Sequence, residues 1–163
     1  MTGLYSKRQF KVLNHAQLKR RTQGETYSIA VFTMEELSAI IANLGHDAAQ
    51  EAIRQMGLFI DKHFSDIGGF STRTQTNEFV TVLPYSDLAE AGSILNDFVK
   101  DFEEQGIRDI WAGTRRQAAS GECVEFAILA GIAQGQPIAE IGPIIDSARH
   151  QQKEIARFRC DRR

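Results

Sequence analysis

The run at residues 26–32, "TYSIAVF", constrains the fold most, because it is rich in β-forming residues and apolar on both of its faces. A strand with one polar face can lie against water, whereas a strand that is apolar on both faces must be covered on both. The run at 123–133, "CVEFAILAGIA", alternates at first and then becomes continuously apolar. Both runs therefore predict central strands of a covered sheet.

Apolar residues at helical spacing predict the covering helices. The clearest stripe runs through 46–63, and a second helix over 87–104 begins after the capping pair Ser86-Asp87. We also predict helices at 6–21 and 35–43, and a final helix at 143–157 with Pro143 in its first position.

The remaining strands are shorter and are separated by polar turns. The stretch 65–84 reads as two strands joined by a hairpin at 74–77, and 107–111 reads as a short strand. Residues 112–121, "AGTRRQAASG", are predicted to be a solvated loop. The order of elements predicts an α+β sandwich with a central mixed, mostly antiparallel sheet, formed by one domain over 1–158 and followed by a charged tail at 159–163.

Charge and composition exclude several classes of protein. The formal net charge of the 163 residues is -2, which gives no basic surplus for binding nucleic acid. No apolar run is long enough to span a membrane and no leader pattern is present, so we expect a cytoplasmic protein. Cys123 and Cys160 have no metal-binding spacing, and we expect neither a disulfide nor a metal site from them.

Five short motifs occur in one order along the chain. They are "TGLYSKRQF" at 2–10, "LGHDAAQ" at 44–50, "RTQTNEFVTVLP" at 73–84, "AILAGIA" at 127–133 and "IDSARHQQKEIAR" at 145–157. In this order they resemble the TGLxNRRxF, GHDxGD, RYGGDEFxxLLP, SIGIA and ADxALYxAKxxGR motifs of the GGDEF domain, the bacterial diguanylate cyclase family. The resemblance implies a nucleotidyl-cyclase-like fold over nearly the whole chain.

The resemblance also implies a chemistry, in which two GTP molecules held by a homodimer are condensed to cyclic di-GMP. Phosphoryl transfer of this kind depends on positioning and on metal ions held by carboxylates. The family's metal carboxylates fall on Thr33 and Asn77, and neither residue carries a charge. Mg²⁺ would be expected only in an active domain, so we expect no metal and no cofactor.

The nucleotide-contacting positions are altered as well. The two signature glycines fall on Gln75 and Thr76, while Glu78 and Phe79 are kept. The two guanine-reading positions fall on Ile41 and Gln50. The phosphate-cradling motif has lost its Phe at Leu37 and its Lys at Ser38, and the RxxD motif of the inhibitory product site falls on Asp66 and Gly69. We therefore interpret the signature as vestigial and expect no catalytic residue.

Two features remain open at this point. Lys153 and Arg157 match the family's phosphate-gripping pair one helical turn apart, and they form either a retained anion site or a solvated basic face. His46 is either a ligand or base, or a structural residue at a helix start.

Three hypotheses about function follow. The first is an inactive GGDEF domain, not an enzyme, that acts as a regulatory or protein-interaction module in bacterial cyclic-dinucleotide signalling. Its partner would be another signalling protein or domain, or a second copy of the chain. The second is an allosteric sensor that binds GTP without turnover through Lys153 and Arg157. The third is a divergent active cyclase that uses Glu35 and Glu78 as replacement metal ligands.

Overall fold

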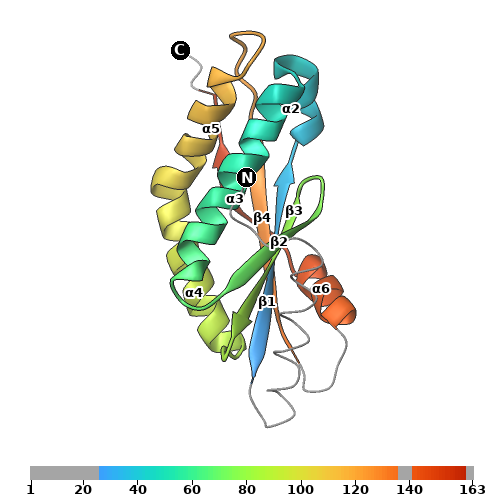
Figure 1. Ribbon diagram of the computed structural model, residues 1–163, viewed down its shortest axis with the longest axis vertical. Helices are drawn as coiled ribbons and strands as arrows, with labels where there is room; N and C mark the ends of the chain where they lie inside the picture. Colours follow the sequence, from blue (N-terminus) through green and yellow to red (C-terminus); the bar gives the residue numbers. More distant parts are fainter. Residues whose placement is uncertain (1–25, 136–140, 161–163) are drawn as a thin grey trace.

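A single five-stranded sheet forms the centre of the protein. In the computed structural model, which describes residues 26–135 and 141–160, the strand order is β2-β3-β1-β4-β5 (Figure 1). The strands are β1 Tyr27–Glu35, β2 Phe70–Gln75, β3 Glu78–Pro84, β4 Phe126–Gln134 and β5 Lys153–Phe158. Each neighbouring pair is antiparallel. The α+β prediction is confirmed, although the described sheet is antiparallel throughout rather than mixed.

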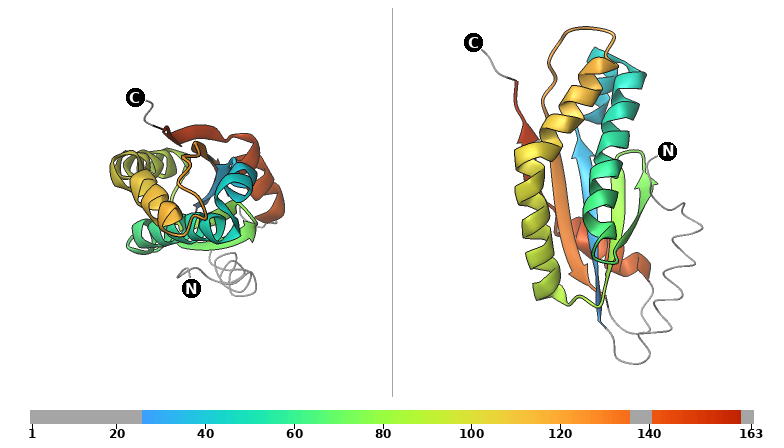
Figure 2. Two further views of the ribbon diagram at one scale, coloured as in Figure 1. Left: turned by 90° about the horizontal axis from the view of Figure 1, so that it is seen from above. Right: turned by 60° about the vertical axis from the view of Figure 1, so that its left-hand side comes forward.

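Helices lie on both faces of this sheet (Figure 2). They are α2 Leu37–Leu44, α3 His46–Ser65, α4 Leu88–Asp101, α5 Ile107–Arg116 and α6 Ile141–His150, and a π-helical turn, η1 Phe102–Gly106, joins α4 to α5. Helix α3, α4 and α5 cover one face, and α6 packs on the opposite face against β1 and β4. The sheet therefore has the two covering layers that its apolar central strands require.

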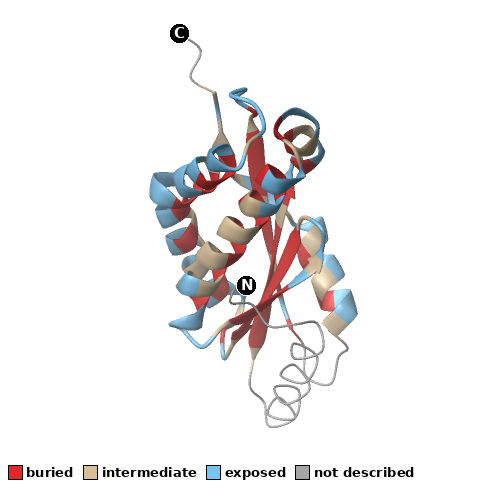
Figure 3. Cartoon of the chain, turned by 45° about the horizontal axis from the view of Figure 1, so that its top comes forward, coloured by how far each residue is buried: buried red, intermediate tan, exposed pale blue. Residues whose placement is uncertain are grey.

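The alternation of β1 explains why there are two cores. Phe32 and Met34 belong to the cluster under α3, α4 and α5, whereas Ile29 and Val31 belong to the cluster under α6. All four side chains are fully buried. In Figure 3 the buried residues follow the central strands and the inner sides of the helices.

Two sequence predictions around α5 are wrong. Residues 107–111 form helix rather than a strand, and this helix takes in the first part of the predicted loop 112–121. Its buried side chains Ile107, Ile110 and Thr114 recur at helical spacing, and this stripe is too short to be distinguished from strand alternation in isolation. The cap at the start of α4 is confirmed, because the Asp87 side chain accepts a hydrogen bond from the Glu90 N–H at 2.8 Å.

The predicted final helix over 143–157 is also wrong in its second half. Helix α6 ends at His150, and β5 then pairs with β4 at the edge of the sheet. The ring of Phe158 stacks on Trp111 and Phe126, with centroid distances of 4.6 and 5.4 Å. These contacts are tertiary, and they stabilise an extended segment where the local pattern favours helix.

Cys123 and Cys160 form a disulfide, which contradicts the expectation that neither cysteine serves as a cross-link. Cys123 is exposed and precedes β4. Cys160 follows β5 and lies in the segment predicted to be a free tail. The two cysteines are 37 apart in sequence, so it is the fold, through the pairing of β4 with β5, that brings them together.

The helix predicted at 6–21 lies outside the described residues. Among the helices that the structure does describe, none combines the length and the apolar character that crossing a membrane requires.

Candidate functional site

The hairpin between β2 and β3 brings the two predicted metal positions together. Thr33 lies near the end of β1, directly opposite Glu78 at the start of β3. Asn77 precedes Glu78 and exchanges two hydrogen bonds with Met34, in which the Met34 N–H donates to the Asn77 carbonyl and Asn77 Nδ2 donates to the Met34 carbonyl, both at 2.9 Å. The positions inferred from the resemblance therefore meet at one end of β1.

The Thr33 hydroxyl accepts a hydrogen bond from a glutamine that is distant in sequence. Gln152 Nε2 donates a hydrogen bond to Thr33 Oγ1 at 2.7 Å and lies 3.2 Å from the Val31 carbonyl. Gln152 is held there by α6, which packs closely on β4 at Gly131. A Cβ added to Gly131 would overlap the backbone carbonyl oxygen of Ala148 and lie 2.8 Å from the backbone nitrogen of Gln152.

Glu78, the carboxylate kept from the signature, forms a bidentate ion pair with Arg149. Arg149 Nε and Nη2 donate to the two Glu78 carboxylate oxygens, each at 2.8 Å, and Thr74 Oγ1 donates to Oε1 at 2.6 Å. The Glu78 side chain is 4% exposed and that of Arg149 is 35% exposed. A nearly buried carboxylate is thus neutralised by a cation that reaches in from α6.

The environment of Glu78 acts on its pKa in two directions. Burial raises the pKa, while the hydrogen bonds from Arg149 and Thr74 and the charge of Arg149 lower it. The lowering contributions together exceed the effect of burial, so Glu78 has a pKa below its usual value. Glu78 is therefore ionised at neutral pH, and its negative charge is already matched by Arg149.

The side chains at the two metal positions do not provide the ligands that a magnesium ion needs. Mg²⁺ is normally held by one or two carboxylates together with substrate phosphates. Here the two metal positions offer a hydroxyl and an amide, and the neighbouring carboxylate accepts hydrogen bonds from a guanidinium. In the part of the chain that the structure describes, no three His, Cys, Asp or Glu side chains form a group able to hold a metal.

Arg73, just before the signature turn, donates hydrogen bonds to the backbone of that turn. Arg73 Nη2 donates to the Thr76 carbonyl at 2.7 Å, and Arg73 Nε lies 3.2 Å from the Gln75 carbonyl. Gln75 and Thr76 are exposed, whereas Phe79 is fully buried in the main core. Two carbonyls of the turn are therefore bound by Arg73, and side chains stand at the two positions where glycines would let a nucleotide approach the backbone closely.

The predicted phosphate-binding pair does not share a helix face. Lys153 and Arg157 lie on β5, where four residues of separation span about 13 Å rather than one helical turn. Arg157 donates to Glu154 at 2.7 and 3.0 Å and lies 3.6 Å from Glu36, so its charge is matched locally. Lys153 is exposed.

The other candidate residues are dispersed. Ile41 on α2 is half-buried against the main core, and Gln50 is exposed on α3. Glu35 is exposed at the end of β1, and it faces Ala127 of β4 in the sheet register. His46 is exposed at the first position of α3, where Gly45, with φ of 98°, begins the helix.

The inhibitory product site also lacks its charged pair. Asp66 and Gly69 lie in the connection between α3 and β2. The backbone N–H of Gly69 donates to the Phe64 carbonyl at 2.9 Å, which closes the end of α3.

Arg149 and Gln152 were not predicted from the sequence, although they make the most informative contacts at the site. The sequence did contain a signal for them. In the family motif ADxALYxAKxxGR, the position that matches Arg149 is Leu and the position that matches Gln152 is Ala. An arginine near the end of α6 and a glutamine just after it, both in place of apolar residues, indicate polar partners beneath them.

Comparison with known proteins supports the identification of the family. The family model described as "Diguanylate cyclase, GGDEF domain" matches residues 1–109. No curated protein matches the chain.

Several solved structures share the fold at low sequence identity. The GGDEF domain of DgcB from Caulobacter crescentus, in complex with c-di-GMP, has a TM-score of 0.73 at 15% identity and covers 90% of this chain and 82% of its own. The FimX GGDEF domain from Pseudomonas aeruginosa has a TM-score of 0.72 at 16% identity, covering 92% and 87%. Diguanylate cyclase SiaD from Pseudomonas aeruginosa, in complex with its activator SiaC, has a TM-score of 0.69 at 16% identity, covering 92% and 54%.

The matched region contains β1, the signature hairpin and helix α2 to α4, and the solved neighbours share the arrangement of the whole sheet. The chain belongs to the GGDEF domain family.

Proposed function

We propose that this GGDEF domain is catalytically inactive and acts as a regulatory or protein-interaction module in cyclic di-GMP signalling. The proposal depends above all on one observation, that the carboxylate retained from the signature is bound by Arg149 at 2.8 Å on both of its oxygens.

A metal-dependent cyclase needs negative charge at the two metal positions, where this chain has Thr33 and Asn77, and the charge of the neighbouring Glu78 is paired with Arg149. A metal ion approaching Glu78 would have to displace a guanidinium that makes two charge-assisted hydrogen bonds. Thr33 and Asn77 are uncharged; Thr33 Oγ1 accepts a hydrogen bond from Gln152, and Asn77 Nδ2 donates one to the Met34 carbonyl. Since loss of one stabilising group alone can cost about 10²–10³ in rate, these changes together support loss of turnover and of the metal.

A binding role accounts for a fold that is kept without its chemistry. SiaD is a neighbour in fold that was solved with its activator protein. By analogy, we infer that the partner of this domain is another signalling protein or domain, or a second copy of the chain.

The decisive experiment incubates the pure protein with GTP and either Mg²⁺ or Mn²⁺, with a diguanylate cyclase of intact signature as the positive control. We expect no cyclic di-GMP above a blank without protein. Clear product formation that is lost in Glu78→Gln would overturn the proposal and would favour the divergent cyclase.

A second measurement separates the interaction module from a nucleotide sensor. Arg157 already pairs with Glu154 and Glu36, which disfavours a phosphate site on β5. Titration calorimetry with GTP should therefore show no binding up to near-millimolar nucleotide. Binding that is abolished by Lys153→Ala would instead establish the sensor.

A further inference from the structure

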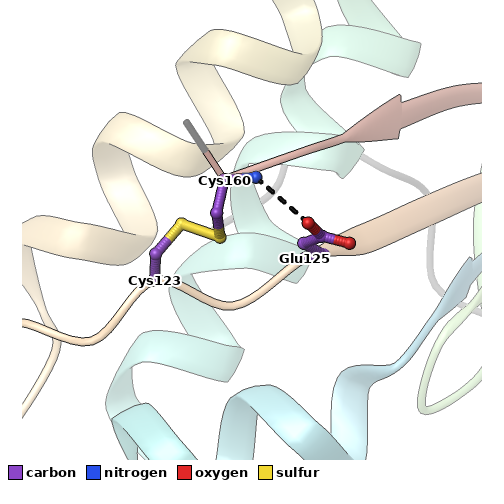
Figure 4. Close-up of a disulfide and its surroundings, with 3 residues drawn as sticks. All are labelled: Cys123, Glu125 and Cys160. Carbon is purple, nitrogen blue, oxygen red and sulfur yellow. Dashed lines mark hydrogen bonds between the residues drawn. A yellow bond between two sulfur atoms is a disulfide. The ribbon is translucent and has the colours of Figure 1, made fainter. Parts of the chain in front are cut away.

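The Cys123–Cys160 disulfide fastens the last strand of the sheet to the loop before β4. Figure 4 shows Cys123 on that loop and Cys160 at the end of β5, with Glu125 beside them. Strand β5 lies at the sheet edge and therefore pairs on one side alone, with residues Phe126–Ala130 of β4. The disulfide thus closes the free end of a strand that has a single neighbour.

The other contacts of β5 are few. Within the strand, Ala156 is the one residue that is buried, and the pairing with β4 contains an irregularity at Ile128/Leu129. The Cys160 N–H approaches Glu125 Oε1 at 3.4 Å, a long hydrogen bond. The strongest side-chain contact is the stacking of Phe158 between Trp111 and Phe126. An edge strand held in this way is expected to fray from its free end once its covalent anchor is removed.

The two cysteine residues differ in exposure to solvent. Cys123 is exposed, whereas Cys160 is half-buried. Thiol–disulfide exchange requires a thiolate to reach one sulfur in line with the bond, so we assign the attack of an external thiol to Cys123, the more exposed residue.

We propose that Cys123 and Cys160 form a reversible thiol–disulfide exchange site, with a small thiol of the glutathione class as its reactant. We call this disulfide the latch, because it holds the end of β5 against β4 when it is closed and releases that end when it is reduced. In the closing direction, the Cys123 thiolate attacks oxidised glutathione, forms a mixed disulfide and releases one glutathione thiolate. The Cys160 thiolate then attacks the Cys123 sulfur, forms the protein disulfide and releases the second glutathione. Opening is the reverse, so two reduced glutathione molecules yield the protein dithiol and one oxidised glutathione.

Opening the latch changes a surface as well as a bond. Fraying of β5 from its end removes Phe158 from its stack and Arg157 from Glu36, which lies 3.6 Å away. It also uncovers the β4 edge at Phe126–Ala130, and an unpaired strand edge can accept a strand from another chain. The latch therefore controls whether this edge is available.

Hydrogen exchange of the oxidised and the dithiothreitol-reduced protein tests the latch. In the oxidised state we expect β5 amides to be protected to a degree similar to those of β4. In the reduced state, β5 exchange should accelerate at least about tenfold more than that of β1, through local opening with little dependence on denaturant. The double variant Cys123→Ser/Cys160→Ser should behave like the reduced protein without any reductant.

Three outcomes would contradict the proposal. Acceleration of β5 and β1 by the same factor would show that the disulfide stabilises the whole fold without acting as a latch. A disulfide that does not open in glutathione buffers, but opens in dithiothreitol, would be a permanent cross-link. Failure of the single variant Cys160→Ser to take up one glutathione at Cys123, seen by mass spectrometry, would contradict the assigned point of attack.

Discussion

At the scale of single residues, Arg149 is the cation that pairs with the signature carboxylate, Glu78. Its guanidinium contacts both oxygens of Glu78, and the contact is nearly buried on the glutamate side. A fixed guanidinium supplies positive charge without a vacant coordination position, and it cannot bind a phosphate while it holds the carboxylate. The signature carboxylate of this chain is therefore part of an ion pair with a residue of α6.

We predict that Arg149→Leu destabilises the protein although Arg149 is partly exposed. The substitution leaves Glu78 buried without its partner, and it should cost about 1–3 kcal/mol, less than a fully buried pair because solvent reaches Arg149. Urea denaturation at pH 7 measures the loss. The double variant Glu78→Gln/Arg149→Leu should recover part of it, since no unpaired charge is then left. Equal losses in the single and double variants would show that Arg149 acts through packing or through its ion pair with Asp146, and not through Glu78.

We also predict that metal binding depends on Arg149. The variant Thr33→Asp/Asn77→Asp restores two carboxylates, but we expect no Mn²⁺ binding in titration calorimetry while Arg149 remains paired with Glu78. Adding Arg149→Leu and Gln152→Ala to that variant removes the cation and the group bound to Thr33, and weak binding should then appear. Binding by the first variant alone would mean that Arg149 does not block the site.

At the scale of elements, α6 and the residues that follow it bring the polar partners to the hairpin. Helix α6 ends at His150 and lies close to β4 at Gly131, which brings Arg149 and Gln152 over the end of β1. Arg149 lies in the last turn of α6 and Gln152 follows it by three residues. A small shift of α6 should therefore disturb the contacts with Glu78 and with Thr33 together.

Gly131→Ala tests this dependence. The new Cβ would overlap backbone atoms of α6 rather than a flexible side chain, so the helix must move, at a cost of about 1–3 kcal/mol. We expect a lower midpoint in urea and loss of the separate acid dependence that Glu78 contributes. Gly142→Ala is the matched control, because nothing lies within 4 Å of the Cβ it would add, and it should leave stability nearly unchanged.

The sequence predicted those elements whose pattern is local and failed where tertiary contacts decide. The long apolar stripe of α3, the hairpin and the Asp87 cap were all correct, since each is defined by residues close in the chain. The local pattern of β5 predicts helix, because the residues that stabilise the strand, Trp111 and Phe126, come from distant elements. The same limit applies to the site. Its positions followed from the register of the motifs, but the partners Arg149 and Gln152 required the fold.

At the scale of the whole molecule, several carboxylates make stability depend on pH. Hydrogen bonds from Arg54 lower the pKa of Glu51 to about 2 against the opposing effect of burial, and the pKa of Glu78 is also lowered. A group with a depressed pKa in the folded state contributes stability above its unfolded pKa and loses it as the pH falls through the folded value. Burial raises the pKa of Asp61, which acts in the opposite direction.

We therefore expect the free energy of unfolding to be flat near neutral pH and to fall from about pH 4.5 toward pH 2. Glu51→Gln should remove about 0.5–1 kcal/mol of this fall, a modest amount because its partner Arg54 is 41% exposed. Denaturation midpoints measured across this range provide the check. A variant with the same pH profile as the parent would show that the Glu51–Arg54 pair has no net effect.

Reduction of the disulfide should lower global stability as well. A closed loop spanning 37 residues in sequence separation corresponds to about 4 kcal/mol of chain entropy in the unfolded state, and strain or residual structure reduces what is measured. Thermal unfolding with and without dithiothreitol gives the difference, and Cys123→Ser/Cys160→Ser, insensitive to reductant, serves as the control. A melting temperature unchanged by reduction would contradict this prediction.

The cross-link also determines how the fold carries mechanical load. Tension applied to the chain after Cys160 passes through the sulfur bridge to Cys123, ahead of β4, and so bypasses the hydrogen bonds between β4 and β5. In the oxidised protein a pull from that side therefore loads the base of a central strand. In the reduced protein the same pull would peel the edge strand one residue at a time, at a much lower force.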